Sequence, residues 1–187
     1  MTTVCFAYRN RATSRDSIRG RCIDANAVLL PDFSIVADNT QEPEPLLLGG
    51  PTLVAHDGGF AMAYTARHST AFPNGAVLVR TLNQNGGPVS AETTLSSSVQ
   101  PSIAPAIARR SDGRLLALWY DCAGSTGCDI LGRYADASGQ PLEQIFRTAL
   151  PAGWLGKWGP LRLAHEEVSL IVHGQINSIS VRTGSRR

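Results

Sequence analysis

The stretch LLALWYDCAGSTGCDILGRYADASGQPL, from Leu115 to Leu142, decides the fold expected of this chain. Its first six residues are apolar, too few for a buried helix and flanked by turn residues, so they predict a core β-strand. Asp121 to Asp129 supplies Gly, Ser, Thr and Cys, which indicates a connection. A second short run, Ile130 to Tyr134, ends at Asp136 to Gly139, whose composition favours a β-turn. The stretch therefore predicts one long β-hairpin that ends in a turn.

Two weaker copies of this hairpin lie upstream in the chain. Dipeptides that end in tyrosine recur at a spacing of 56 residues, which marks a repeat architecture: Ala7-Tyr8, Ala63-Tyr64 and Trp119-Tyr120. Gly20-Arg21 matches Gly132-Arg133 without a gap, and Asp24 then coincides with Asp136. The middle copy carries a three-residue insertion between residues 68 and 74, inside the expected connection, where insertions leave strands intact.

The flanks of each hairpin complete a unit of four antiparallel strands. A short strand opened by proline precedes the second and third hairpins, at Pro51 to Ala55 and at Pro105 to Ala108. A polar strand follows each turn, at residues 33–37, 89–95 and 142–148. Four-stranded sheets that recur about every fifty residues are typical of a β-propeller, which hides its sheet edges by radial packing.

The predicted fold is therefore an all-β β-propeller in a single domain, with two full four-stranded blades and two partial blades. It is either a partial ring or a half-propeller that closes by self-association into a homodimer. The first unit lacks its innermost strand, and the tail forms a shortened unit without an outer strand. The expected blades are residues 3–40 (partial), 51–96, 101–149 and 160–183 (partial).

Composition excludes several function classes. The chain has 187 residues, 43% of them hydrophobic, and a formal net charge of +2, so it is long enough for one globular core and weakly charged. No sustained basic run with interleaved aromatics and no transmembrane run occurs, which argues against nucleic acid and against membrane insertion. No cofactor motif is present, and the histidines have no nearby nucleophile motif.

The four cysteines form two pairs, each within one expected hairpin. Cys5 and Cys22 face each other across the first, and Cys122 and Cys128 across the third. Two local disulfides are the prediction, and they indicate an oxidising compartment, hence a secreted or cell-envelope protein. The alternative is four free, buried thiols in a cytosolic protein. No signal peptide opens the chain, so we expect Met1 to be an internal start and the N-terminus to be incomplete.

Candidate ligand-binding residues lie on one expected face of the propeller, where the connections from second to third strands meet the linkers between blades. The linker PAGWLGKWGP places Trp154, Lys157 and Trp158 in a Gly-rich loop, where the two indole rings are suited to stacking on a sugar or holding a partner loop. The alternative is that they fill the gap between blades.

Charged residues at the same face give further candidates. Asp121 and Asp129 flank a Gly-rich connection, but two carboxylates without EF-hand spacing make a poor calcium site, so turn capping is the alternative and no metal is predicted. Arg9, Arg11 and Arg67 are suited to binding a carboxylate or sulfate, with a solvated loop as the alternative.

The third unit resembles the repeat of secreted and cell-surface bacterial β-propeller proteins, whose blades read W-x-D, D-I-[YF]-x-x-R and D-x-x-G-x-x-L. The residues that carry the match are Trp119, Asp121, Asp129, Ile130, Arg133, Asp136, Gly139 and Leu142. Residues 103–117 are also similar to the opening blade of sialidases. That family needs an arginine where this chain has Ile103, and its S-x-D-x-G-x-T-W boxes are replaced here by other turns.

Such repeats indicate the fold and say little about activity, and we expect a non-enzymatic binding or scaffold module, with a glycan or another surface protein as its partner. The alternative is a degenerate sialidase-like glycoside hydrolase. A further alternative is a truncated fragment of a larger propeller protein, whose exposed sheet edges would make it prone to aggregation.

Overall fold

The computed structural model describes residues 4–11, 16–36, 47–48, 50–67, 74–96, 101–122, 128–142, 144–148, 161–164, 167–172 and 175–178. These residues form four antiparallel β-sheets and no helix, as the all-β prediction requires. No helix long and apolar enough to cross a membrane therefore occurs among them. The last sheet is described by its backbone alone.

The sheets follow one another along the chain. The first sheet contains β1 (Val4–Arg11), β2 (Asp16–Ile23) and β3 (Phe33–Val36). The second contains β4 (Leu47–Leu48), β5 (Thr52–His56), β6 (Gly59–Arg67), β7 (Ala76–Asn83) and β8 (Thr93–Thr94). The third contains β9 (Ser102–Arg109), β10 (Leu115–Cys122), β11 (Cys128–Ala135) and β12 (Phe146–Arg147). The fourth contains β13 (Leu161–Ala164), β14 (Glu167–Val172) and β15 (Gln175–Ser178).

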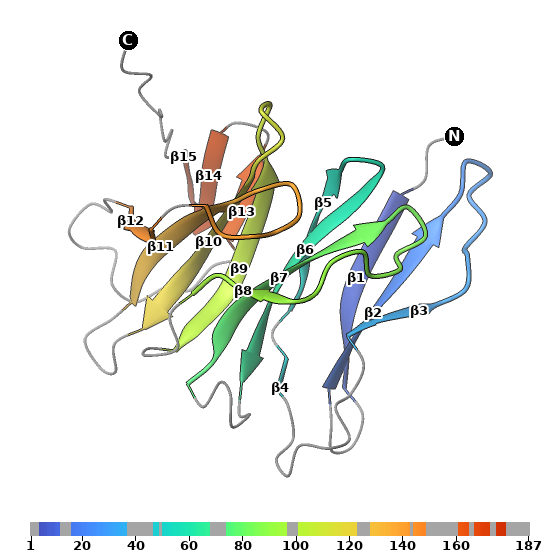
Figure 1. Ribbon diagram of the computed structural model, residues 1–187, viewed down its shortest axis with the longest axis horizontal. Helices are drawn as coiled ribbons and strands as arrows, with labels where there is room; N and C mark the ends of the chain where they lie inside the picture. The colour runs from blue at the N-terminus through green and yellow to red at the C-terminus, as the bar shows by residue number, and fades with distance from the viewer. Residues whose placement is uncertain are drawn as a thin grey trace.

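The four sheets lie side by side in chain order and form an open arc rather than a closed ring (Figure 1). Neighbouring sheets touch through their inner strands: β1 contacts β5, β5 contacts β9, and β9 contacts β13. This arrangement is propeller-like, as predicted, while the division of the chain into blades of a ring stays a prediction.

The predicted hairpin from Leu115 to Leu142 is confirmed as β10 and β11, which pair in antiparallel register. Strand β9 begins three residues before the predicted Pro105. A β-bulge lies opposite Trp119, and Ala104 within it has a φ of 50°. Because Pro105 has no N–H to donate, it is tolerated at such an irregularity, and the strand continues through it.

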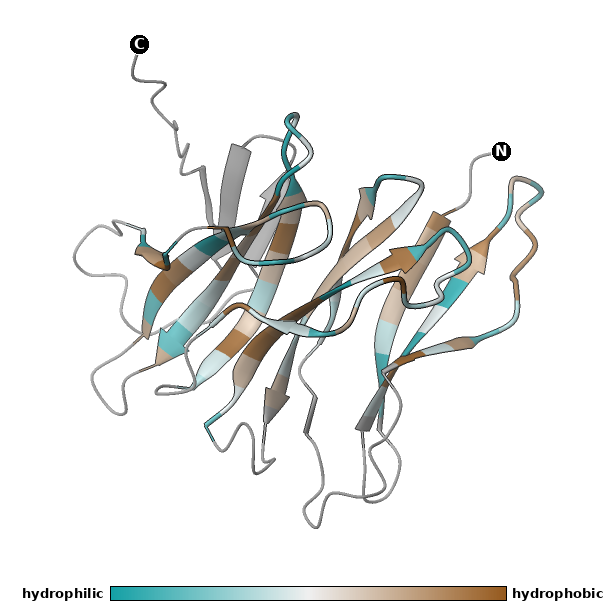
Figure 2. Ribbon diagram, in the orientation of Figure 1, coloured by the Kyte–Doolittle hydropathy of each residue, from teal (hydrophilic) through white to brown (hydrophobic). Residues whose placement is uncertain are grey.

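The central strands pack on both faces. On β6, Ala61 and Ala63 pack with the third sheet, whereas Met62 and Tyr64 pack with the first. Successive side chains of a strand point to opposite faces, so a strand covered on both sides needs an unbroken apolar run. Figure 2 shows hydrophobic colour along these strands and hydrophilic colour at many of the turns. This packing explains why the runs that predicted strands do not alternate.

One turn recurs at the end of β2, β7 and β11, in the first, second and third sheets. Its first side chain accepts backbone N–H bonds on Oδ1 from the residues two and four positions later. The residues that cap it are Asp24, Asn83 and Asp136. The residue three positions later has a positive φ of 61°, 80° or 88°. Those left-handed residues are Ala27, Gly86 and Gly139. The predicted match of Asp24 with Asp136 is therefore confirmed, and Asn83 joins it.

Cross-strand partners define the other equivalent positions. The arginine three residues before each capping residue faces the preceding strand: Arg21 opposes Phe6, Arg80 opposes Met62, and Arg133 opposes Ala117. Two residues after Phe6, Met62 and Ala117, on the same strands, lie Tyr8, Tyr64 and Trp119. The third aromatic is therefore Trp119 and not Tyr120, so the second spacing is 55 residues, not the predicted 56. A one-residue slip would place the ring on the other face of the sheet.

Candidate functional site

A row of polar side chains crosses one end of the third sheet. Asp121 on β10 lies directly opposite Asp129 on β11, and on its other side lies opposite Ser102 on β9. Arg147 of β12 forms an ion pair with Asp129. Ser102, Asp121, Asp129 and Arg147 are called the polar row below. Both aspartates lie within strands, not in the connection where the sequence placed them, and their partners in the described structure are not turn amides.

The two carboxyl groups have different surroundings. Ser102 is fully buried, and its hydroxyl donates to Oδ2 of Asp121 at 3.5 Å. Burial raises the pKa of Asp121, and the charge of Asp129 raises it further, while the Ser102 hydroxyl and Arg147 oppose the rise. Asp129 is about half exposed and is held by the Arg147 guanidinium. The row therefore combines a partly buried carboxyl group whose pKa is raised with a half-exposed carboxyl group that is paired with an arginine.

The acidic pair does not come from the repeat. At the corresponding place in the second sheet Ala66 opposes Ala76, and in the first sheet Asn10 opposes Ser17. Like charges directly opposite each other destabilise a sheet. The pair occurs in one of the first three sheets, whereas capping residues and arginines recur in all three, so it is a candidate functional feature.

Both predicted disulfides are present. Cys5 is bonded to Cys22 and Cys122 to Cys128, and each pair lies directly opposite in its hairpin. The second disulfide is adjacent to Asp121 and Asp129 and closes the strands at the point where the row lies. Covalent closure of the hairpin limits how far the two carboxyl groups can separate.

The other predicted site residues are only partly described. Arg9 lies on β1 opposite Ile18 and is partly buried. Arg11 and Arg67 end β1 and β6, and only their backbone is described. The linker with Trp154, Lys157 and Trp158 lies outside the described residues. The structure therefore brings together two of the eight predicted binding residues, Asp121 and Asp129, and adds Ser102 and Arg147.

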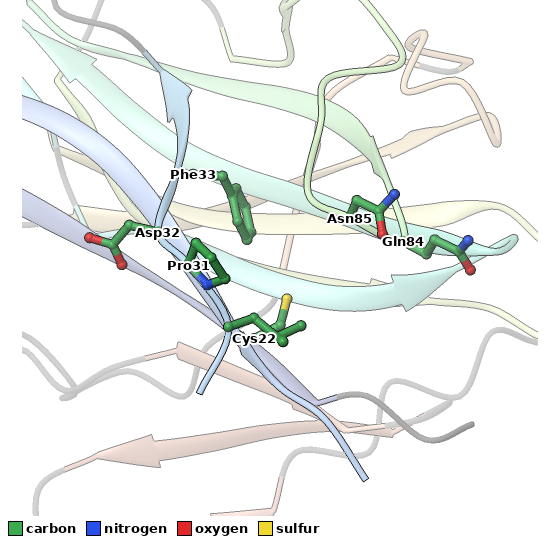
Figure 3. A pocket seen from close by; sticks show the side chains of 7 residues that line it. Cys22, Pro31, Asp32, Phe33, Gln84 and Asn85 are labelled. Atoms are coloured by element: carbon green, nitrogen blue, oxygen red, sulfur yellow. The ribbon is translucent and has the colours of Figure 1, made fainter. Parts of the chain in front are cut away.

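A groove that the sequence did not predict lies between the first and second sheets, at the end away from the polar row. Its volume is about 480 Å³, and the residues that line it are Cys22, Leu30, Pro31, Asp32, Phe33, Gln84 and Asn85. Figure 3 shows the Asp32 carboxylate on the side of its segment away from Gln84 and Asn85. The groove is thus lined by apolar side chains, two amides and Asp32. Within the described ranges, no group of three or more His, Cys, Asp or Glu side chains is placed to hold a metal ion.

No protein-family model and no curated protein sequence matches this chain. Solved structures do match it. An alpha-L-arabinanase of Penicillium chrysogenum complexed with arabinobiose has a TM-score of 0.59 and 10% identity, over 82% of this chain and 47% of that one. An endo-arabinase from Bacteroides thetaiotaomicron VPI-5482 has a TM-score of 0.57 and 15% identity, over 96% of this chain and 72% of that one.

Both neighbours have a β-propeller fold. At these identities the likeness shows the fold alone, and it agrees with the propeller-like architecture predicted from the repeat. The chain spans about half the length of the Penicillium enzyme and about 72% of the Bacteroides enzyme. The bacterial repeat motif and the sialidase likeness stay predictions, because neither neighbour tests them.

Proposed function

We propose that this chain is a carbohydrate-binding propeller module and that the polar row of the third sheet contacts the sugar. The observation that carries the proposal is the Asp121 and Asp129 pair, which the second and first sheets replace with uncharged residues. The row offers carboxylate acceptors and a guanidinium donor side by side, and sugar hydroxyl groups both donate and accept.

The fold neighbours support a sugar as the ligand class. One of them was solved with arabinobiose, and both are named as arabinan-degrading enzymes. Arabinan fragments are therefore the first ligands to test. The two disulfides favour a secreted or cell-envelope location, where such polysaccharides are met.

Glycoside hydrolysis is the second candidate function. Such enzymes use two carboxyl groups, of which one carries a proton and the other is ionised. The two carboxyl groups of the polar row have unlike surroundings, because burial raises the pKa of Asp121 while Arg147 forms an ion pair with Asp129. If the row is hydrolytic, Asp121 supplies the proton to the leaving oxygen and Asp129 acts as the base or nucleophile.

Binding and turnover can be separated in one experiment. Titration calorimetry with arabinobiose and with arabinan measures binding, and the release of reducing ends measures hydrolysis. We expect saturable binding that Asp121→Asn and Asp129→Asn each weaken by about tenfold or more, because each removes a hydrogen bond to a charged group. The matched control is Asp112→Asn, which changes a carboxylate in the turn between β9 and β10, at the opposite end of the third sheet.

Each result has a defined meaning. Reducing-end release that falls at least about 100-fold in both aspartate variants would establish the hydrolase instead of the binding module. Turnover of a fluorogenic sialoside would establish the sialidase-like alternative. If neither arabinan ligand binds, or if Asp112→Asn has the same effect as the row variants, the proposal is wrong.

A further inference from the structure

Arginines on β7 and β11 join neighbouring sheets. Nη1 of Arg80 on β7 donates to the carbonyl of Ile35 in the first sheet at 2.9 Å. Nη1 of Arg133 on β11 donates to the carbonyl of Leu95 next to β8 in the second sheet at 3.2 Å. In both cases the guanidinium reaches from one sheet to the outer strand region of the sheet before it. A charged donor on a buried carbonyl fixes the distance between the two sheets.

Arg21 is the member of this series on the first sheet. It precedes the capping residue Asp24 by three positions and opposes Phe6, as Arg80 opposes Met62. No sheet precedes the first one among the described residues. Its guanidinium instead contacts its own sheet: Nε lies 3.0 Å from the carbonyl of Leu30 and 3.2 Å from a carboxylate oxygen of Asp32.

The surroundings of Arg21 also match those of a contact between sheets. Tyr8 and Asp32 are hydrogen-bonded at 2.8 Å beside Arg21, and Arg80 similarly pairs with Glu92 on the face of the second sheet that carries Tyr64. The difference is exposure. Phe6 is 42% exposed, whereas the equivalent Met62 and Ala117 are 0% and 1% exposed because a neighbouring sheet covers them.

A continuous outward face results on the first sheet. Its members alternate along β1 and β2 with the residues that pack on the second sheet. They are Val4, Phe6, Tyr8, Arg19 and Arg21, called the outward face below. Val4 is 61% exposed, so two large apolar side chains lie on this surface beside two guanidinium groups. Apolar anchors with adjacent arginines are typical of the centre of a protein interface.

We propose that the outward face binds a second copy of this chain, through the last sheet of that copy. The junction of the second sheet with the first and the junction of the third with the second each join the arginine-bearing face of one sheet to the opposite face of the sheet before it. The first sheet lacks a predecessor in the described structure, and the fourth sheet, which packs on β9 through β13, lacks a successor there. The proposal therefore pairs the arginine-bearing face at one end of the arc with the last sheet at the other end.

The ends do not meet within one chain, because the arc is open (Figure 1). Two copies that pair first sheet to last sheet at both junctions form a closed, two-fold symmetric assembly. In it, Arg21 donates to a backbone carbonyl of the partner's last sheet, and Phe6 is buried as Met62 is. The outward face thus binds the last sheet of the second copy, through contacts of the same kind as those between the second and first sheets.

The test is sedimentation velocity of the full chain, oxidised, over a range of concentrations. We expect a species of twice the chain mass, and we expect Phe6→Asp to weaken its formation by at least about tenfold, as loss of an interface anchor does. Val89→Asp is the matched control, because Val89 is 67% exposed and lies in the connection between β7 and β8, away from the outward face. It should leave association unchanged.

Hydroxyl-radical footprinting of the unaltered chain gives a second test that does not depend on a variant folding. Phe6 and Tyr8 should lose reactivity as the dimer forms, whereas Val89 and Leu142, exposed elsewhere, should keep theirs. A chain that stays monomeric at all concentrations overturns the proposal. So does a dimer in which Phe6 remains reactive, or one that Phe6→Asp and Val89→Asp weaken equally.

Discussion

Gly86 and Gly139 occupy the same position in equivalent turns, so the pair separates backbone strain from steric clash. Both have a positive φ, of 80° and 88°. An alanine at Gly86 would place its Cβ inside the volume of the Phe33 ring, whereas at Gly139 the nearest atom, Cγ1 of Val79, lies 3.3 Å away. The Phe33 ring cannot simply swing aside, because it also lies against the backbone of Gly20 on β2.

The two costs can be estimated separately. A non-glycine residue in the left-handed region costs about 1 kcal/mol in either turn. Overpacking a filled site adds about 1–3 kcal/mol, and this addition applies at Gly86. We therefore expect Gly86→Ala to lose about 2–4 kcal/mol of the free energy of unfolding, and Gly139→Ala to lose about 1 kcal/mol plus a small amount for the displacement of Val79.

Urea denaturation of both variants, with the disulfides intact, measures the difference. The midpoints should move while the dependence on denaturant stays the same, since neither change alters the surface exposed on unfolding. Equal losses in the two variants would refute the conclusion that the Phe33 ring is clamped between the first and second sheets. A larger loss for Gly139→Ala would refute the equivalence of the turns.

Three further predictions concern the same fold. Replacing both cysteines of the first-sheet disulfide, which are 17 residues apart, by serine should lower the free energy of unfolding by about 3 kcal/mol. The same change at the third-sheet disulfide, with a separation of 6 residues, should lower it by about 2 kcal/mol. Urea midpoints measure both losses, and the reverse order would contradict the loop-entropy argument. Asp136→Asn should cost up to about 1 kcal/mol at neutral pH. Although burial opposes the shift, hydrogen bonds from Ser138 and from turn amides lower the pKa of Asp136. Its contribution to stability is therefore present above the pKa of an unfolded aspartate and is lost as the pH falls below about 4. A stability difference between wild type and variant that grows in acid would contradict this. His56→Ala should lower the free energy of unfolding, measured by thermal unfolding, by about 1–3 kcal/mol, because the buried His56 ring is hydrogen-bonded to the carbonyl of Ala137 in the third sheet at 2.6 Å. A loss below about 0.5 kcal/mol would show that this contact between sheets is dispensable.

Local features of the sequence predicted the hairpins and turns well. The apolar run at 115–120, the Asp136 turn and the facing cysteines all depend on residues close in the chain, and each is confirmed. Cross-strand pairing within a hairpin follows from the turn and the alternation of side chains, so the sequence contains enough information to place it.

Register between repeats was harder to predict. The sequence alignment matched Tyr120 with Tyr64 because both are tyrosines. The aromatic ring of the third sheet that packs on the second sheet, however, is Trp119. The bulge at Ala104 was missed for a similar reason, because a proline in a strand marks either a start or an irregularity, and only the pairing with β10 distinguishes them.

The all-β class, the hairpin units and their disulfides can be predicted from the sequence, since they arise from periodicity and from contacts across short loops. Which side chains from different strands and sheets meet depends on the packing of the sheets. Ser102 and Arg147 join the aspartates because β9 and β12 flank the hairpin, and Arg80 finds its carbonyl on a sheet formed 45 residues earlier. Such contacts depend on how the sheets pack face to face, and packing geometry is set by all the side chains between them rather than by any one stretch of chain.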